Sequence, residues 1–202
     1  MNISRTKKIT GIILCGGKSS RMGKNKALLK INEKYIISYV IDTLSPFCDE
    51  IILSTNTKEL NFLGLQTVND KFNNIGPISG IYSSLQESKN EINIILSCDT
   101  PFINSYLLTE LLSNSENFDM VLPEFNSHLQ PMTGVFKKII LPVIESEINS
   151  GNYIPPRIFE KTNLNKLKIT DKDHFYHKHL FFNVNSPEDF SKAQEIMEKN
   201  KG

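Results

Sequence analysis

Short apolar runs rich in β-branched residues recur along the chain, and segments with helical spacing of apolar residues separate them. This alternation is typical of an α/β domain in which helices cover a largely parallel sheet. Several of the runs are continuously hydrophobic, as strands that are buried on both faces must be. The pattern predicts a three-layer αβα fold with strands over residues 10–15, 50–55, 65–68, 92–97, 119–122, 132–136 and 180–184.

Several segments between and after these strands place their apolar residues on one helical face, which predicts helices that pack against the sheet. The last of them also has a start signal, because Ser186 can cap a helix and Pro187 suits its first turn. The apolar faces consist of Ile36, Ile37, Val40, Ile41 and Leu44, of Ile78, Ile81, Tyr82 and Leu85, and of Phe190, Ala193, Ile196 and Met197.

The composition narrows the possible partners and locations. The 202 residues include 23 Lys and Arg against 22 Asp and Glu, which argues against nucleic acid or a membrane as the main partner. The longest apolar runs are far shorter than the ~20 residues that cross a bilayer. The 3 cysteines form no CxxC pair, and reduced thiols are typical of cytosolic proteins. We expect a cytoplasmic protein with a single domain over residues 1–202, of which residues 1–8 form a flexible lead-in.

A loop of glycines and cations, Cys-Gly-Gly-Lys-Ser-Ser-Arg-Met-Gly-Lys-Asn-Lys over residues 15–26, follows the first predicted strand. Glycines let backbone N–H groups approach a ligand, and loops at the carboxyl ends of parallel strands are where α/β sheets bind nucleotides. The charge of a triphosphate would be offset by the cations of this loop, Lys18, Arg21, Lys24 and Lys26. A solvated basic turn is the alternative interpretation.

Two common phosphate-binding motifs do not fit this loop. A Walker A motif that ends in Gly17-Lys18-Ser19 needs a glycine at position 12, where the chain has Ile12, and Gly11 is one residue out of register. The G-x-G-x-x-G fingerprint is also absent, which argues against an oxidoreductase with a nicotinamide or flavin cofactor.

The loop resembles the signature of the nucleotidyltransferases that make molybdenum cofactor dinucleotides, the MobA-type family of molybdenum cofactor guanylyltransferases. That signature reads L-A-G-G-x-S-x-R-M-G followed by a lysine, and Cys15 replaces its alanine here. The resemblance implies a Rossmann-like nucleotidyltransferase fold, with Arg21 and Lys26 stabilising charge during catalysis. It also implies that the nucleotide is bound by Leu14, Cys15, Gly16, Gly17, Arg21 and Lys26.

Two further stretches extend the resemblance toward the base of the nucleotide. Val-Asn-Asp at residues 68–70 is similar to the family's V-x-D, and Gly-Pro-Ile-Ser-Gly-Ile at residues 76–81 is similar to its G-P-L-x-G-I. The resemblance implies that Asp70 and Gly80 hold the guanosine and that Asn56 lies near the base. A plain helix start is the alternative for the glycine and proline of the second stretch.

Asp99 follows a buried strand in the run Cys-Asp-Thr-Pro at residues 98–101. Mg²⁺ prefers oxygen ligands and is usually held by one or two carboxylates. Asp99 is therefore a candidate ligand, and it resembles the metal-binding aspartate of the family's C-D-x-P. The run at residues 182–189 resembles the family's N-x-N-T-P-E-D-L, which implies that Asn185 lies close to the metal. The alternatives are that Asp99 caps a helix and that Asn185 caps the final helix together with Ser186.

The acceptor side matches the family less well. Gln130 and Pro131 belong to a stretch that is similar to the one that faces the pterin, and of the basic residues that meet its phosphate only Arg157 has a counterpart. His174, His177 and His179 lack a cysteine or carboxylate at ligand spacing, so we expect a solvated loop there and no metal site.

The resemblance implies a Mg²⁺-dependent transfer of GMP from GTP to molybdopterin or molybdenum cofactor, with molybdenum-enzyme delivery proteins as further partners. Base identity depends on a few hydrogen bonds that a sequence does not show. A transferase that uses CTP or another phosphorylated acceptor therefore stays open, and so does a catalytically silent nucleotide-binding protein.

Overall fold

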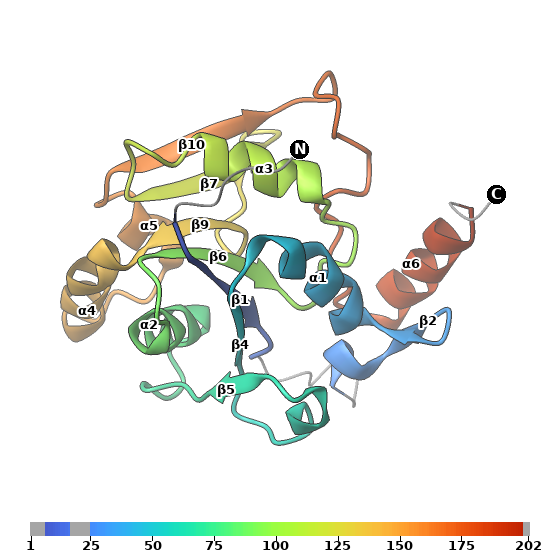
Figure 1. The fold of residues 1–202 in the computed structure, drawn as a ribbon, viewed down its shortest axis with the longest axis horizontal. Helices are drawn as coiled ribbons and strands as arrows, with labels where there is room; N and C mark the ends of the chain where they lie inside the picture. The colour runs from blue at the N-terminus through green and yellow to red at the C-terminus, as the bar shows by residue number, and fades with distance from the viewer. Residues whose placement is uncertain (1–6, 17–24, 200–202) are drawn as a thin grey trace.

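A central sheet of eight strands organises the computed structural model, which describes residues 7–16 and 25–199 (Figure 1). Its strands lie in the order β10-β7-β9-β6-β1-β4-β5, and β8 pairs with β7. Strand β9 runs antiparallel to β6 and β7, and the other neighbours along this order are parallel. The strands are β1 (Ile9–Leu14), β4 (Glu50–Ser54), β5 (Gln66–Val68), β6 (Ile92–Ser97), β7 (Met120–Phe125), β8 (His128–Leu129), β9 (Gly134–Lys137) and β10 (Leu164–Ile169).

Helices cover both faces of this sheet. Successive residues of a strand point to opposite faces, and the residues of β1 are buried on both, so each face packs against helices. Ile13 packs in one core cluster with residues of α1 (Ile36–Leu44) and α3 (Ser105–Ser113). Ile12 packs in a second cluster with residues of α2 (Pro77–Glu87), α4 (Leu141–Asn149) and α5 (Pro155–Phe159). The prediction of an α/β fold with three layers and a mostly parallel sheet is confirmed.

A smaller unit lies beside the main sheet. The hairpin of β2 (Lys30–Ile31) and β3 (Lys34–Tyr35) packs through Ile31 against Ala193 and Ile196 of α6 (Pro187–Lys199). Figure 1 shows α6 on the same side of the molecule as this hairpin. Short 3-10 helices complete the described elements, over Lys26–Leu28 (η1), Ser45–Phe47 (η2), Asn61–Leu63 (η3) and Lys138–Ile140 (η4). The three helices predicted from apolar faces are confirmed as α1, α2 and α6.

The strand predicted over residues 180–184 is wrong, and β10 is a strand that the pattern did not reveal. Leu180 and Val184 are apolar because they pack into core clusters, while the segment itself consists of turn and irregular backbone. Strand β10 lies at the edge of the sheet, and of its residues only Ile169 is buried. An edge strand with Asn165, Lys166 and Lys168 has no continuous apolar run to detect.

Within the described residues, no helix is both long and apolar enough to span a bilayer. The cytoplasmic location and the single-domain organisation stay predictions. The flexible lead-in was predicted over residues 1–8, of which 1–6 lie outside the described residues.

Candidate active site

The carboxyl ends of β1, β4 and β6 meet at one edge of the sheet. Leu14 lies opposite Ser54 of β4 on one side and opposite Ser97 of β6 on the other. Backbone hydrogen bonds continue this register past the strand ends, since the Cys15 N–H donates to the Ser54 carbonyl at 2.9 Å and the Cys98 N–H donates to the Leu14 carbonyl at 3.1 Å. The residues that follow these strands are therefore brought side by side.

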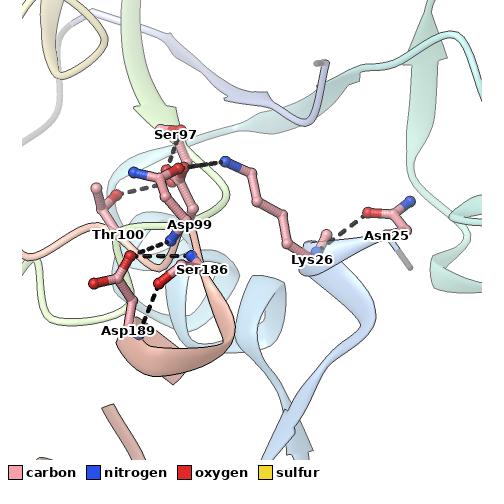
Figure 2. A network of polar contacts seen from close by, with 9 residues as sticks. Asn25, Lys26, Ser97, Asp99, Thr100, Ser186 and Asp189 are labelled. Atoms are coloured by element: carbon pink, nitrogen blue, oxygen red, sulfur yellow. Dashed lines mark hydrogen bonds and ion pairs between the residues drawn. The ribbon is translucent and has the colours of Figure 1, made fainter. Parts of the chain in front are cut away.

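Lys26, Asp99 and Asn185 come together at this edge although they are far apart in the sequence. Figure 2 shows the Lys26 side chain extended toward Asp99. The Lys26 ammonium forms an ion pair with Oδ2 of Asp99 and donates to Oδ1 of Asn185 at 3.1 Å. Lys26 begins η1, whose N-cap Asn25 accepts a hydrogen bond from the Ala27 N–H at 3.2 Å. The cap fixes the start of η1, from which the Lys26 side chain extends toward Asp99.

Asp99 is a buried carboxylate with both oxygens engaged. Its side chain is 8% exposed; Oδ2 meets Lys26, and Oδ1 accepts a hydrogen bond from the Ser97 hydroxyl. Its backbone carbonyl accepts from the Val184 N–H at 2.9 Å, which ties the segment before α6 to the end of β6. The helix-cap alternative for Asp99 does not hold, because Asn104 caps α3 by accepting from the Leu107 N–H at 3.0 Å.

Asn185 precedes α6, whose start is capped by its neighbours. The Ser186 hydroxyl accepts from the Asp189 N–H at 3.1 Å, and the Asp189 carboxylate accepts in return from the Ser186 N–H at 3.0 Å. This reciprocal pair satisfies two backbone N–H groups at the start of the helix. The Asn185 side-chain oxygen therefore faces Lys26 and does not cap the helix.

A second polar centre lies at the ends of β4 and β5. The Asn56 amide donates to Oδ2 of Asp70 at 2.7 Å, and the Asp70 N–H donates to Oδ1 of Asn56 at 2.8 Å. Gly80 of α2 lies against this pair: a Cβ there would be 2.5 Å from the Ser54 hydroxyl oxygen and 3.2 Å from Oδ1 of Asp70. A glycine lets the helix approach Asp70 this closely. Asn56, Asp70 and Gly80 therefore lie together, and their predicted contacts with the guanosine stay predictions.

Two cysteines lie beneath the site. Cys15 and Cys98 are 9% and 1% exposed, and both belong to the same core cluster. A hydrogen bond with Cys98, together with burial, raises the pKa of the Cys15 thiol well above its usual value. A thiolate is the reactive form of cysteine, so Cys15 is a packing residue and a poor nucleophile.

The structure does not bring every predicted site residue to Asp99. Gly17 and Arg21 lie outside the described residues, whereas Leu14, Cys15 and Gly16 are at the end of β1. Gln130 and Pro131 lie between β8 and β9, and the Gln130 N–H donates to the Pro123 carbonyl of β7 at 2.9 Å. Strand β9 begins two residues after Met132 and pairs antiparallel with β6, so this turn lies at the same sheet edge as Asp99.

Arg157 is exposed on α5. That helix packs through Phe159 against Phe136, at a ring-centroid distance of 5.6 Å, and Phe136 pairs with Asn93 near the start of β6. Because β6 has 6 residues and a strand rises about 3.3 Å per residue, its two ends are roughly 16 Å apart. Figure 1 likewise shows α5 beside the arrowhead of β9, away from the end of β6 that leads to Asp99.

The histidines of the loop before α6 do not gather into one cluster. His177 Nε2 lies 3.1 Å from the Phe102 carbonyl oxygen, His179 packs against the Phe102 and Phe182 rings, and His174 lies edge-on to Tyr106. Burial lowers the pKa of His179. No group of three or more His, Cys, Asp or Glu side chains placed to hold a metal occurs among residues 7–16 and 25–199.

Ser97 is the contact that sequence reasoning missed. It is a polar residue at the end of an apolar strand, two positions before the carboxylate that it contacts. Its position at the end of the strand could have indicated a role near Asp99. The hydrogen bond itself depends on the conformation of the turn at residues 98–99, which the motif does not specify.

In open α/β sheets, ligands such as nucleotides bind outside the carboxyl ends of the strands, and Lys26, Asp99 and Asn185 converge at this edge. Residues 11–163 match the family model of the MobA-like NTP transferase domain, and the chain belongs to this family of nucleotidyltransferases.

Relatives with similar sequences cover nearly the whole chain. A probable molybdenum cofactor guanylyltransferase of Clostridium perfringens strain 13 is 35% identical over 94% of this chain and 99% of its own length. One of Carboxydothermus hydrogenoformans is 33% identical over 93% of this chain and 96% of its own. The crystal structure of molybdopterin-guanine dinucleotide biosynthesis protein A from Archaeoglobus fulgidus has a TM-score of 0.79 at 22% identity, covers 94% of this chain and 99% of its own, and shows that the fold is shared.

Proposed function

We propose that this nucleotidyltransferase transfers GMP from GTP to the terminal phosphate of molybdopterin or molybdenum cofactor and releases pyrophosphate. The names of relatives that match over nearly the whole chain support this choice of donor and acceptor. The observation that carries the proposal is the convergence of Lys26, Asp99 and Asn185 beside the end of β1, where the nucleotide loop begins. Proteins that deliver the cofactor to molybdenum enzymes are further proposed partners.

The donor set at this edge fits Mg²⁺. Asp99 offers a buried carboxylate and Asn185 a neutral amide oxygen, which are both ligands that Mg²⁺ accepts. The two oxygens already converge on one cationic group, the Lys26 ammonium, so the site favours positive charge between them. We propose that Asp99 and Asn185 hold the ion. When bound, Mg²⁺ would neutralise negative charge on the phosphate oxygens of the nucleotide.

Lys26 has a second task in this proposal. A divalent ion held by Asp99 and Asn185 would repel the Lys26 ammonium, which would then be available to the phosphates of GTP. There it stabilises the charge that develops on the leaving pyrophosphate, together with Arg21 and the loop N–H groups. Lys26 therefore contacts Asp99 and Asn185 in the free protein and the phosphates when GTP is bound.

The chemical step needs no side-chain nucleophile. A phosphate monoester is ionised at neutral pH, and its oxygen forms the new bond to the α-phosphorus of GTP. The bond from that phosphorus to the oxygen that bridges the α- and β-phosphates breaks, and pyrophosphate leaves with the electron pair. The protein contributes positioning and charge stabilisation, as in other phosphoryl transfers.

Asp70 is the residue that we propose for recognition of the base. Its Oδ2 is held by Asn56 and its backbone N–H is also bound to Asn56, so the carboxylate has a fixed orientation. Guanine presents two adjacent donors, N1–H and the N2 amino group, which suit a carboxylate acceptor. Gln130, Pro131 and Arg157 stay predicted acceptor contacts.

Pyrophosphate release with molybdopterin as acceptor tests the proposal. GTP, CTP, ATP and UTP are compared at equal concentration with Mg²⁺, and we expect turnover with GTP to exceed turnover with the other three. Faster turnover with CTP would identify a cytidylyltransferase and reject the proposed donor. Tight nucleotide binding without turnover with any donor would indicate a catalytically silent binding protein.

A further inference from the structure

Two side chains contact the carboxylate of Asp99, Lys26 at one oxygen and Ser97 at the other. The Ser97 hydroxyl donates to Oδ1 of Asp99, while Oδ2 faces Lys26 (Figure 2). We propose that Ser97 is a positioning residue, which fixes the Asp99 carboxylate so that one oxygen stays directed at the cation position. The inference deepens the proposed function and rests on its assignment of Asp99 to the cation.

Ser97 is well placed for such a role because its own backbone is fixed. It is the last residue of β6 and lies opposite Leu14 of β1 in the parallel ladder. Its carbonyl also accepts a hydrogen bond from the Thr100 hydroxyl at 2.8 Å, which closes the turn that contains Asp99. The hydroxyl therefore projects from the rigid end of a buried strand, and the turn presents the carboxylate to it.

The orientation of a carboxylate about its last side-chain torsion is otherwise weakly determined. Lys26 holds Oδ2 only as long as its ammonium occupies the cation position. The hydrogen bond from Ser97 uses Oδ1 and not Oδ2, so it does not depend on whether the Lys26 ammonium stays in place. Loss of a hydrogen bond to a metal-ligating group typically costs about 10–100-fold in metal affinity or activity.

The test compares Ser97→Ala, which removes the donor, with Ser97→Thr, which keeps it. Ser84→Ala is the matched control, because Ser84 is fully buried in α2 and its hydroxyl oxygen has no hydrogen-bond partner within the described residues. Mn²⁺ binding to the purified full chain is measured by electron paramagnetic resonance, with a GTP analogue that carries a methylene group between the α- and β-phosphates. Thermal melting of each variant checks the fold.

We expect Ser97→Ala to weaken Mn²⁺ binding about 10–100-fold, Ser97→Thr to stay within about threefold of wild type, and Ser84→Ala to be unchanged. Equal affinity in wild type and Ser97→Ala would overturn the inference. A loss of equal size in Ser84→Ala, or in a folded Ser97→Thr, would also overturn it, because the effect would then not depend on the hydroxyl donor.

The same proteins separate this inference from the proposed function. If wild type binds Mn²⁺ and the analogue but releases no pyrophosphate from GTP and molybdopterin, the proposed function fails while the Ser97 comparison still stands. If wild type turns over and Ser97→Ala matches it in Mn²⁺ affinity, the Ser97 inference fails alone.

Discussion

The nucleotide half of the site, around Asp99, and the predicted acceptor half, around Gln130 and Arg157, are built in different ways. In the nucleotide half, Cys15 and Asp99 follow strands whose register is fixed, since Leu14 is the neighbour of both Ser54 and Ser97. In the acceptor half, Gln130 lies on a turn and Arg157 lies on the short helix α5, which packs on the sheet through Phe159. A motif that directly follows a parallel strand therefore predicts the position of its residues more closely than a motif on a turn or a short helix does.

The largest effect should come from Asp99→Asn in the nucleotide half. The substitution keeps the size of the side chain but removes the negative charge that holds Lys26 and the proposed ion. We expect pyrophosphate release to fall about 10²–10³-fold, the usual cost of losing a main charge-stabilising group. The control is Asp171→Asn, an exposed aspartate in the loop after β10, which should leave turnover unchanged. More than a tenth of wild-type turnover in a folded Asp99→Asn protein contradicts the role.

Asp70→Asn should have the next largest effect, and it should be specific to the base. An amide replaces one carboxylate oxygen by a donor, so the paired donors of guanine lose an acceptor. We expect kcat/KM for GTP to fall about 10–100-fold, as for a lost hydrogen bond to a charged group. ITP, which lacks the N2 amino group, is the substrate control, and its kcat/KM should fall less. An equal loss for both nucleotides would show that Asp70 does not contact the N2 amino group.

In the acceptor half, Gln130→Ala and Arg157→Ala should separate the two predicted contacts. Gln130 lies at the same sheet edge as Asp99, so its loss should raise the KM for molybdopterin about 2–10-fold, with the KM for GTP unchanged. Arg157 is on α5, toward the other end of β6, so we expect a smaller change in the same constant. A larger effect of Arg157→Ala would mean that the acceptor extends across the sheet face, or that α5 moves when it binds.

The central strands that the sequence predicted contain continuous apolar runs. Continuous apolar runs predicted β1, β4 and β6 because these strands are buried on both faces, and the carboxylate after β6 followed from that strand. Edge strand β10 was not predicted because Asn165, Lys166 and Lys168 interrupt its apolar residues. A strand was wrongly predicted over residues 180–184 because the same apolar residue types are buried in a core cluster and in a sheet.

Contacts within the candidate site divide in the same way. The pairing of Lys26 with Asp99 and Asn185 follows from motifs that each belong to the end of a regular element. The cap that Ser186 forms at the start of α6 was also predicted from the sequence, whereas the hydrogen bond from Ser97 depends on turn geometry. A short sequence motif identifies the residue types in a turn but not the direction in which each side chain points.

The smallest expected effect is on thermal stability, at the loop that joins α4 to α5, the helix that carries Arg157. Glu147 accepts hydrogen bonds from Lys161 at 2.6 Å and from Asn152 at 2.6 Å. These contacts, the one from Lys161 first, lower the pKa of Glu147 below its usual 4.5. A lowered pKa in the folded state means that Glu147 stabilises the fold above the unfolded pKa and that this stability is lost as the pH falls through the folded pKa.

Glu147→Gln should therefore lower the melting temperature at pH 7, and the difference from wild type should shrink as the pH is reduced below 4.5, the usual pKa of the group. Glu160→Gln is the control, because its ion pair with Lys166 lies at the surface with the glutamate 58% exposed, where such pairs contribute little. Calorimetry between pH 7 and pH 3 measures both variants. A difference for Glu147→Gln that stays constant with pH would show that packing of the amide, and not the charge of Glu147, holds this loop in place.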